Sequence, residues 1–417
     1  GAPDPRKNTA PAIEAYASEV GFVLSDVDHA LRRLRRWTQP QRRRSPLSAW
    51  PAHSAVRPEP YGVALILAPW NYPMQLLFSP LVGAMAAGNC ICIKPSEYAP
   101  ATSHLVAEAV RETFPADYLW PVEGNGDTAA ALLEHEFDTI FFTGSSRIGR
   151  KVMAAAARGL IPVTLELGGK SPCIVCADAR IDVTARRILW GKCLNAGQTC
   201  VAPDYVLVHG SMQQALLDAL KHAHDRFFPD GPRQSADFGR IVNRPHFDRL
   251  CGYLNEGRIE LGGDRHAEDL YIAPTVLTDV PPEAAVMREE IFGPVLPVLT
   301  FDHLDDAVRM VRERPRPLAL YAFTESRTTA RRILDQTPSG GACVNDTISQ
   351  VTGKDLPLGG LGESGMGRYR GKATFDAFSH LRTVLRRGTA IDPPFRYPPM
   401  NLSLRAFKRL CRFMLRR

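Results

Sequence analysis

Short apolar runs alternate with longer amphipathic stretches from residue 61 onward. The apolar runs are rich in β-branched and aromatic residues, which is typical of strands, and the stretches between them have helical spacing. The first series predicts strands at 61–67, 90–94, 138–142 and 162–167 and helices at 74–87, 102–113 and 146–158. Repeated strand–helix–strand units with Gly and Pro at the joints predict a parallel sheet covered by helices. Such sheets bind ligands at the carboxyl ends of their strands.

A second alternation follows Gly168. It predicts strands at 171–177, 205–209, 317–323 and 340–345 and helices at 181–195, 211–227 and 326–335. Two successive α/β units in 417 residues indicate two lobes with a cleft between them. The polar, Arg- and Pro-rich stretch 38–60 is interpreted as an arm or linker.

The charge distribution argues against a nucleic-acid enzyme. The total of +7 consists of +8 over residues 30–58, +9 over 381–417, −3 over 1–29 and −7 over 59–380. The large middle part is therefore mildly acidic, whereas a nucleic-acid enzyme is expected to carry a basic groove there. The composition, 45% hydrophobic and 23% charged, is that of a folded globular chain.

Nine cysteines are scattered along the chain without a secretory segment, which predicts reduced thiols in a cytoplasmic compartment. Cys173 and Cys176 have redox spacing, but they lie in an apolar strand-like run, so core packing is the favoured interpretation. No apolar run reaches the roughly 18 residues needed to span a membrane.

The segment 400–417 is predicted to form a basic amphipathic helix. Leu404, Phe407, Leu410 and Met414 fall on one helical face, and Arg405, Arg409, Arg412 and Arg416 fall on another. Such a helix binds the surface of an anionic membrane or packs on its own or a sister subunit, and both alternatives stay open.

Cys200 stands apart from any apolar periodicity, at the end of a loop of small and polar residues. A cysteine in this setting is a candidate nucleophile, although a thiol needs help to ionise at neutral pH. Glu166 ends a predicted strand just before two glycines. Its carboxylate is either a general base or the ion-pair partner of Lys170.

Glycine-rich turns suggest where phosphates bind. The Gly-Lys-Ser at 169–171 is no phosphate loop, because position 164 is Thr and Pro172 blocks the helix that should follow. Gly144 and Gly149 bracket a turn between a predicted strand and helix, and its free N–H groups could hold a pyrophosphate.

An ordered set of motifs resembles the aldehyde dehydrogenase family over roughly residues 12–400. The motifs are APWNYP at 68–73, KPSE at 94–97, FTGS at 142–145, ELGGK at 166–170, GQTC at 197–200, EIFGP at 290–294 and PLGGLGESGMG at 357–367. VTLELGGKSPC, GQTCVAPDY and RYPP resemble the class 3 branch, which includes fatty, aromatic and coniferyl-type aldehyde dehydrogenases.

The resemblance implies a catalytic role for three residues. Cys200 is then the nucleophile that attacks the aldehyde carbonyl, and Asn71 donates to the oxyanion together with the Cys200 backbone N–H. Hydride passes to the nicotinamide, and Glu166 activates water to hydrolyse the resulting thioester. Asn345 matches a further family position near the active centre.

The resemblance also implies the cofactor contacts. Lys94 and Glu97 would hold the adenosine ribose, Trp70 and Ser145 the pyrophosphate beside Gly144 and Gly149, and Glu290 the nicotinamide ribose, with Phe292 against the ring. A carboxylate at Glu97 accepts from a ribose 2′-OH and repels a 2′-phosphate, so NAD is expected, with NADP as a second cofactor. No metal site is expected.

The implied fold is α/β, with two Rossmann-like lobes and a small bridging arm. We expect an NAD(P)-binding domain at 1–168 that includes the arm 38–60, a catalytic domain at 169–358, a return and bridging segment at 359–399 and the C-terminal helix at 400–417. The expected function is NAD(P)-dependent oxidation of an apolar aldehyde to its acid. A CoA-acylating dehydrogenase and a catalytically idle protein of the same fold are the alternatives.

The resemblance further implies a cytoplasmic homodimer, bridged by 38–60 and residues near 375–395, with peripheral membrane contact through 400–417. Two departures stand out. Family members usually carry more helical sequence before residue 19, so we expect a weakened cofactor lobe, exposed apolar surface or altered assembly. Arg147 lies where many relatives have a small or acidic residue, so pyrophosphate contacts are expected to differ.

Overall fold

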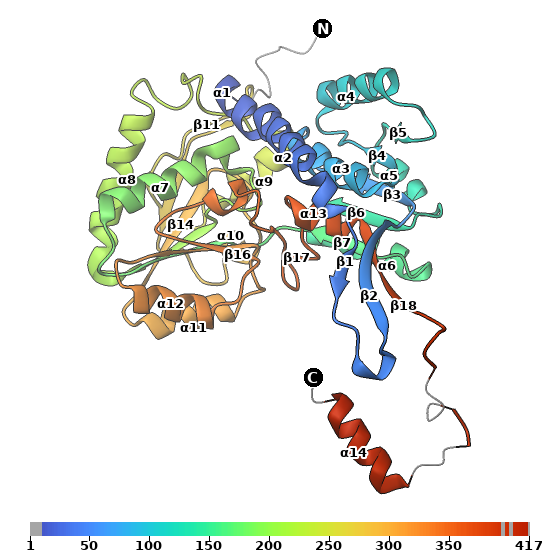
Figure 1. Ribbon diagram of the computed structural model, residues 1–417. Helices are drawn as coiled ribbons and strands as arrows, with labels where there is room; N and C mark the ends of the chain where they lie inside the picture. Colours follow the sequence, from blue (N-terminus) through green and yellow to red (C-terminus); the bar gives the residue numbers. More distant parts are fainter. Residues whose placement is uncertain (1–10, 393–396, 400–402, 416–417) are drawn as a thin grey trace.

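The computed structural model describes residues 11–392, 397–399 and 403–415. Two lobes, each built on one sheet, lie side by side, and an arm leads away from them toward a separate C-terminal helix (Figure 1). Within the described residues, no helix combines the length and the apolar character needed to cross a membrane.

The first lobe is centred on a six-stranded sheet of order β17-β7-β6-β3-β4-β5, parallel except for β17. Its strands are β3 (Val63–Leu67), β4 (Cys90–Lys94), β5 (Leu119–Pro121), β6 (Thr139–Thr143), β7 (Val163–Glu166) and β17 (Gly365–Met366). Its helices are α3 (Gln75–Ala87), α4 (Pro100–Thr113), α5 (Gly126–Leu132), α6 (Ser146–Arg158) and α13 (Lys372–Ala377). The predicted parallel order of the early strands is confirmed.

The second lobe holds a seven-stranded sheet of order β10-β13-β14-β9-β8-β15-β16, parallel except for β10. Its strands are β8 (Pro172–Val175), β9 (Tyr205–His209), β10 (Arg258–Leu261), β13 (Thr275–Thr278), β14 (Val295–Phe301), β15 (Ala319–Phe323) and β16 (Gly341–Val344), and a separate ribbon joins β11 (Arg265–His266) to β12 (Tyr271–Ile272). Its helices are α7 (Ile181–Cys193), α8 (Gln213–Phe227), α9 (Arg244–Tyr253), α10 (Ala285–Arg288), α11 (Leu304–Arg312) and α12 (Arg327–Gln336), with short 3₁₀ turns at Leu194–Gly197, Gly210–Met212 and Ser349–Thr352.

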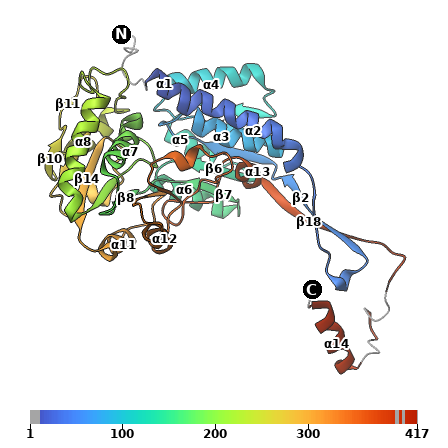
Figure 2. The same cartoon turned by 60° about the vertical axis from the view of Figure 1, so that its left-hand side comes forward.

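The arm is a three-stranded antiparallel sheet of order β1-β2-β18. It consists of β1 (Gln41–Arg43), the 3₁₀ turn Leu47–Ala49, β2 (Ala52–Pro60) and β18 (Ser379–Arg387). Most of residues 38–60 thus lie in the strands and turn of this sheet, which favours the arm over the linker. The helix α14 (Leu404–Leu415) lies beyond the arm, away from both lobes (Figure 2).

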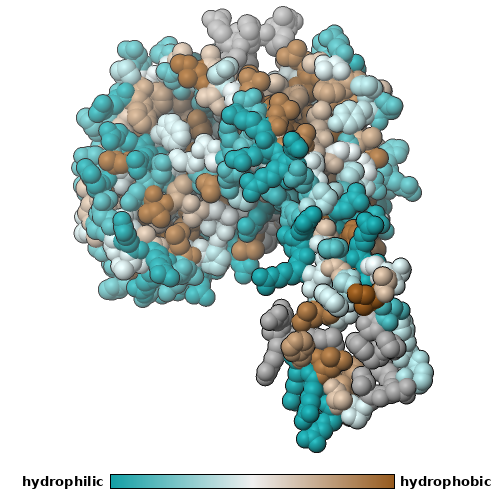
Figure 3. Space-filling model, viewed as in Figure 1, coloured by the Kyte–Doolittle hydropathy of each residue, from teal (hydrophilic) through white to brown (hydrophobic). Residues whose placement is uncertain are grey.

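The described chain begins with α1 (Ala12–Ala15), a π-helical turn (Tyr16–Val20) and α2 (Gly21–Trp37). Large apolar side chains are exposed along this segment, and Figure 3 shows brown side chains over this end of the molecule. Its exposed members are Ile13, Tyr16, Val20, Leu24 and Leu31.

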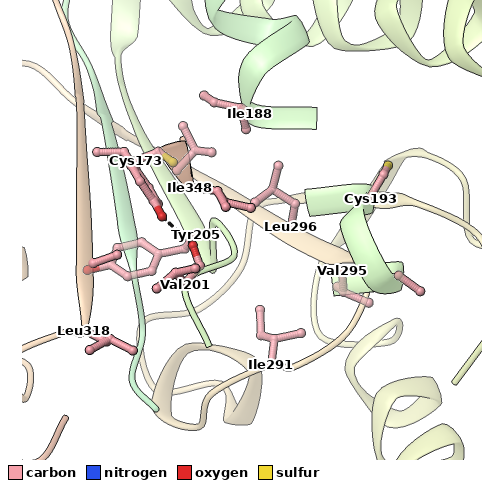
Figure 4. Close-up of a cluster of buried hydrophobic side chains, with 14 of the residues drawn as sticks. Cys173, Ile188, Cys193, Val201, Tyr205, Ile291, Val295, Leu296, Leu318 and Ile348 are labelled. Atoms are coloured by element: carbon pink, nitrogen blue, oxygen red, sulfur yellow. Dashed lines mark hydrogen bonds between the residues drawn. The ribbon is translucent and has the colours of Figure 1, made fainter. Parts of the chain in front are cut away.

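The core of the second lobe is apolar and closely packed. Cys173 on β8, Ile188 on α7 and Leu296 on β14 belong to one buried cluster, part of which is shown in Figure 4. Cys173 and Cys176 are both buried in this cluster, which confirms the interpretation that the pair fills the core. The cluster gives the site a rigid support on the side of this lobe.

Candidate active site

Cys200 lies in the turn that leads from α7 to β9, and its side chain is partly buried. Helix α7 ends at Cys193, and Asn195 and Ala196 then adopt positive φ angles of 50° and 51°. This left-handed backbone reverses the chain and is uncommon for residues other than glycine. Burial raises the pKa of the Cys200 thiol to about 12, and the carboxylates of Glu290 and Glu166 add to the shift.

Asn71 follows β3 in the first lobe and reaches the Cys200 turn in the second. Its Nδ2 donates to the backbone oxygen of Gln198 at 3.0 Å, and Asn195 Nδ2 donates back to the Asn71 backbone oxygen at 2.8 Å. A primary amide carries two N–H groups, so one can hold Gln198 while the other donates to a ligand. The geometry therefore allows the oxyanion contact expected of Asn71.

Glu166 is the last residue of β7 and is almost fully buried. Neither carboxyl oxygen has a hydrogen-bond partner within the described residues, and burial raises the Glu166 pKa well above its usual value. The alternative ion pair with Lys170 is wrong. Lys170 instead forms an ion pair with Asp204 and donates to the backbone oxygen of Glu289 at 2.8 Å.

Glu290 is a second carboxyl whose charge acts on the thiol, and its side chain is partly buried. Burial raises its pKa to about 8, and the charge of Asp204 adds to the shift. A Cβ at position 168 would lie 1.9 Å from Glu290 Oε2, so glycine at this position is what lets the carboxyl approach the backbone. Because Glu166 and Glu290 both act electrostatically on Cys200, the sequence-predicted acids and the thiol share one site.

The expected adenosine contacts lie at the carboxyl end of β4. Lys94 Nζ lies 3.3 Å from Glu97 Oε2 and donates to the backbone oxygen of Pro95 at 2.8 Å. Glu97 is therefore oriented by a buried cation next to it. This ion pair lies at the edge of the sheet where parallel α/β proteins bind nucleotides.

The expected pyrophosphate contacts lie at the start of α6. Ser145 is the N-cap of this helix, its Oγ accepts from the Ile148 backbone N–H at 3.4 Å, and the Ser145 side chain is exposed. Gly149 packs so closely that an added Cβ would lie 2.6 Å from a methyl group of Leu167. The turn between Gly144 and Gly149 thus places the N-terminus of α6 next to the carboxyl end of β6.

Trp70 and Phe292 lie together, with ring centroids 5.4 Å apart in an edge-to-face arrangement. Phe292 has a positive φ of 50°, a strained conformation for a bulky residue that is often found at functional sites. The two expected cofactor contacts therefore meet at one place.

Several buried polar atoms at this edge lack a partner among the described residues, as an absent polar ligand would leave them. They are Thr143 Oγ1, both Glu166 carboxyl oxygens and Glu290 Oε1. Buried polar groups are normally hydrogen-bonded, so this set fits a bound polar ligand at the ends of β6 and β7. Together with the Gly144 turn and the Lys94–Glu97 pair, it fits a dinucleotide. Among the residues that the structure describes, no cluster could hold a metal ion.

A cavity of about 540 Å³ opens beside Cys200. Much of its wall is apolar, with Leu76, Trp190 and Ile348 among the lining residues. Tyr72 also lines it and shares a hydrogen bond of 2.7 Å with the Thr199 hydroxyl. The thiol is therefore accessible from an apolar chamber large enough for a small organic ligand.

The Asn345 side chain binds the backbone of Thr324, the residue that follows β15. Its side chain accepts from the Thr324 N–H at 2.9 Å and donates to the Thr324 carbonyl at 2.9 Å, so both ends of the amide hold β15. Sequence reasoning did not predict roles for Tyr72, Thr199 or Asn195. The local sequence carries no sign of these roles, since they depend on contacts between segments far apart in the chain.

Comparisons with known proteins show which chains this one resembles. A model of the aldehyde dehydrogenase family matches residues 6–384. The chain is 44% identical over 389 residues to 4,4'-diaponeurosporen-aldehyde dehydrogenase of Staphylococcus aureus, covering 93% of this chain and 85% of that one. It is 47% identical over 392 residues to human aldehyde dehydrogenase family 3 member B1, covering 94% and 84%. The solved substrate-bound structure of Staphylococcus aureus AldH has a TM-score of 0.94 at 43% identity, covering 97% and 88%.

Proposed function

This chain belongs to the aldehyde dehydrogenase family, and we propose that its substrate is an apolar aldehyde attacked by Cys200. Its activity is the NAD(P)-dependent oxidation of an aldehyde to the carboxylic acid. The predicted resemblance to the class 3 branch is confirmed by the family 3 relatives. The observation that carries the substrate proposal is the apolar cavity of about 540 Å³ that opens onto the thiol.

Cys200 reacts as its thiolate, after its proton passes to Glu166 and on to water. Sγ then forms a bond to the aldehyde carbon while the C=O π bond breaks, and the carbonyl oxygen becomes an oxyanion. Asn71 Nδ2 and the Cys200 backbone N–H donate to that oxygen, which favours the addition because charge develops there. One donor of this kind typically accelerates a reaction about 10²- to 10³-fold. The contact of 3.0 Å between Asn71 and Gln198 supports this role, since it ties the amide to the turn that carries the thiol.

NAD(P), when bound, accepts the hydrogen of the aldehyde carbon together with its electron pair. The thioester that remains on Cys200 is cleaved by water. Glu166 takes a proton from that water, the acid leaves, and the thiol is restored. The burial that raises the pKa of Glu166 supports the role of base, because a carboxylate with a raised pKa binds a proton more strongly.

Lys94, Glu97, Gly144, Ser145, Gly149 and Trp70 hold the cofactor in this proposal, with Glu290 and Phe292 at the nicotinamide end. Glu97 favours NAD, since a carboxylate repels a 2′-phosphate. Lys94 lies 3.3 Å from that carboxylate and reduces the repulsion, so NADP is accepted with a higher KM.

The test follows NADH formation by the full chain with linear aldehydes of four to ten carbons. Burying one methylene contributes about 0.8 kcal/mol, so kcat/KM is expected to rise about fourfold per added methylene until the cavity is filled. Cys200→Ala is expected to lose at least about 10³-fold in turnover. Cys90→Ala, which changes an exposed cysteine, serves as the matched control and keeps full turnover.

Full turnover by Cys200→Ala would contradict the catalytic assignment. Rates that are independent of chain length would contradict the apolar substrate. Activity that requires coenzyme A would indicate that the acyl group of the thioester is transferred to coenzyme A and is not hydrolysed. The same assay with NADP⁺ tests the cofactor preference.

We further propose a homodimer joined through the arm, and peripheral contact of α14 with an anionic membrane surface. The exposed apolar residues Leu381 and Leu385 on β18 support the first proposal. Exposed Leu404 and Phe413 on a helix that also carries Arg405 and Arg409 support the second.

A further inference from the structure

One acidic side chain lies in the wall of the apolar cavity without any role in the reaction described above. Glu14 belongs to the short helix α1 and lines the same cavity as Cys200. It is partly buried, and burial raises its pKa to about 7. Acidic side chains are seldom placed in apolar surroundings unless they have a partner.

The partner of Glu14 is the nucleophile turn. Glu14 Oε1 accepts a hydrogen bond from the backbone N–H of Asn195 at 2.6 Å. Asn195 is the first of the two residues with positive φ that reverse the chain after α7. Residues other than glycine adopt this left-handed conformation infrequently, so an anchored Asn195 N–H helps to maintain it.

The same residue continues the connection to the oxyanion donor. Asn195 Nδ2 donates to the Asn71 backbone oxygen at 2.8 Å and lies 3.3 Å from the Gln198 oxygen. Asn71 Nδ2 also donates to the Gln198 oxygen. Glu14, the segment after β3 and the Cys200 turn are thus linked by one set of hydrogen bonds.

We propose that Glu14 is a positioning residue, whose carboxyl fixes the turn so that the Cys200 thiol faces the Asn71 amide. The proposal rests on the proposed function, because it takes Cys200 as the nucleophile. Glu14 touches neither reacting atom. It acts through Asn195, and its effect is on the geometry of attack.

Losing this hydrogen bond should lower kcat and leave cofactor binding intact. A misplacement of about 1 Å in a reacting group can cost 100-fold in rate. We expect Glu14→Ala to reduce kcat about 10- to 100-fold with the KM for NAD changed less than twofold. Glu14→Gln retains an oxygen acceptor of the same length and is expected to stay within about threefold of the parent kcat.

Glu14→Asp keeps the charge but shortens the side chain by one methylene, so its carboxyl cannot reach the Asn195 N–H at 2.6 Å without movement of α1. It is expected to resemble Glu14→Ala, and it provides the measurement if the alanine variant fails to fold. Asp26→Asn is the control. Asp26 ties the neighbouring helix α2 to Arg370 and Ser79, so this change should lower Tm while kcat stays within about threefold.

A parent-like kcat in Glu14→Asp or Glu14→Ala would overturn the proposal. A glutamine variant as impaired as alanine would also overturn it, because the charge would then matter more than the hydrogen bond. Cys200→Ala is assayed beside these variants. Turnover by Cys200→Ala would mean that the proposed function fails, whereas its inactivity with fully active Glu14 variants would mean that only the positioning role fails.

Discussion

Burial raises the pKa of three ionisable side chains in the candidate active site, the nucleophile Cys200 and two carboxyls. The Cys200 pKa is about 12, the Glu290 pKa about 8, and the Glu166 pKa is raised well above its usual value. The Cys200 thiol and the Glu290 carboxyl are therefore mostly uncharged near neutral pH. Because charges of like sign would repel each other here, the neutral forms are what permits the groups to pack together.

The raised pKa of Glu290 predicts that the free energy of unfolding depends on pH. Below the unfolded pKa of about 4.5, Glu290 is protonated in both states, so its contribution does not change with pH. Between pH 4.5 and 8 the unfolded chain loses this proton and the folded chain keeps it. The free energy of unfolding then falls with rising pH, by at most about 1.4 kcal/mol per unit. Above pH 8 this loss is constant.

Glu290→Gln stays neutral and avoids that cost. The free energy of unfolding of the variant, minus that of the parent, is therefore expected to increase from pH 5 to pH 8. Urea unfolding of both proteins at pH 5, 6.5 and 8 measures this difference. A difference that does not change with pH would show that Glu290 is not buried in its neutral form.

Elements with a strong local pattern were predictable from the sequence. The predicted helix 146–158 and the predicted strands 90–94 and 205–209 match α6, β4 and β9 residue for residue. The strands of the arm were not predictable in this way. β2 contains Pro58 and Pro60 and pairs with β18, whose residues lie more than 300 positions later in the chain. A strand whose partner is so distant leaves little signal in its own sequence.

Helix α14 exposes apolar and basic side chains together. Leu404 and Phe413 are each 68% exposed on a helix whose remaining exposed residues include Arg405, Lys408 and Arg412. Such a helix should bind vesicles that contain anionic lipid and should not bind zwitterionic vesicles. Removal of residues 400–417 is expected to abolish binding in a vesicle flotation assay. Neutralising Arg33 and Arg36 on α2 is the control and should leave binding unchanged.

Binding that survives this deletion would refute the membrane proposal. If the deletion instead alters the sedimentation of the protein without any effect on vesicles, α14 packs on a sister subunit.

On the scale of the whole molecule, the site exists only where the two lobes and the N-terminal helix meet. Cys200, Glu166 and Asn71 could be identified from the sequence, because each lies in a recognisable local motif. The role of Glu14 depends on a hydrogen bond across 181 positions, and the cavity wall combines residues from α1, α3, α7 and the segment after β16. Periodicity and spacing describe neighbours in sequence. The role of Glu14 and the composition of the cavity wall could therefore not be predicted before the fold was known.

The arm extends from the lobes and exposes the outer edge of β18, the last strand of its sheet (Figures 1 and 2). An edge strand presents unpaired N–H and C=O groups that can pair with another chain, and Leu381 and Leu385 are 52% and 47% exposed on one face of it. A two-fold symmetric dimer would cover both features at once, since each copy offers the same surface.

We therefore expect sedimentation velocity to give twice the mass of one chain, and the double variant Leu381→Lys/Leu385→Lys to sediment as a monomer. His380→Lys, which adds a charge on the opposite face of β18, is the matched control and should remain dimeric. A parent protein that sediments as a monomer, or a double variant that stays dimeric, would contradict assembly through this arm. If the variant becomes a monomer with an unchanged Tm, the arm serves assembly and contributes little to the stability of the lobes, whose cores lie elsewhere.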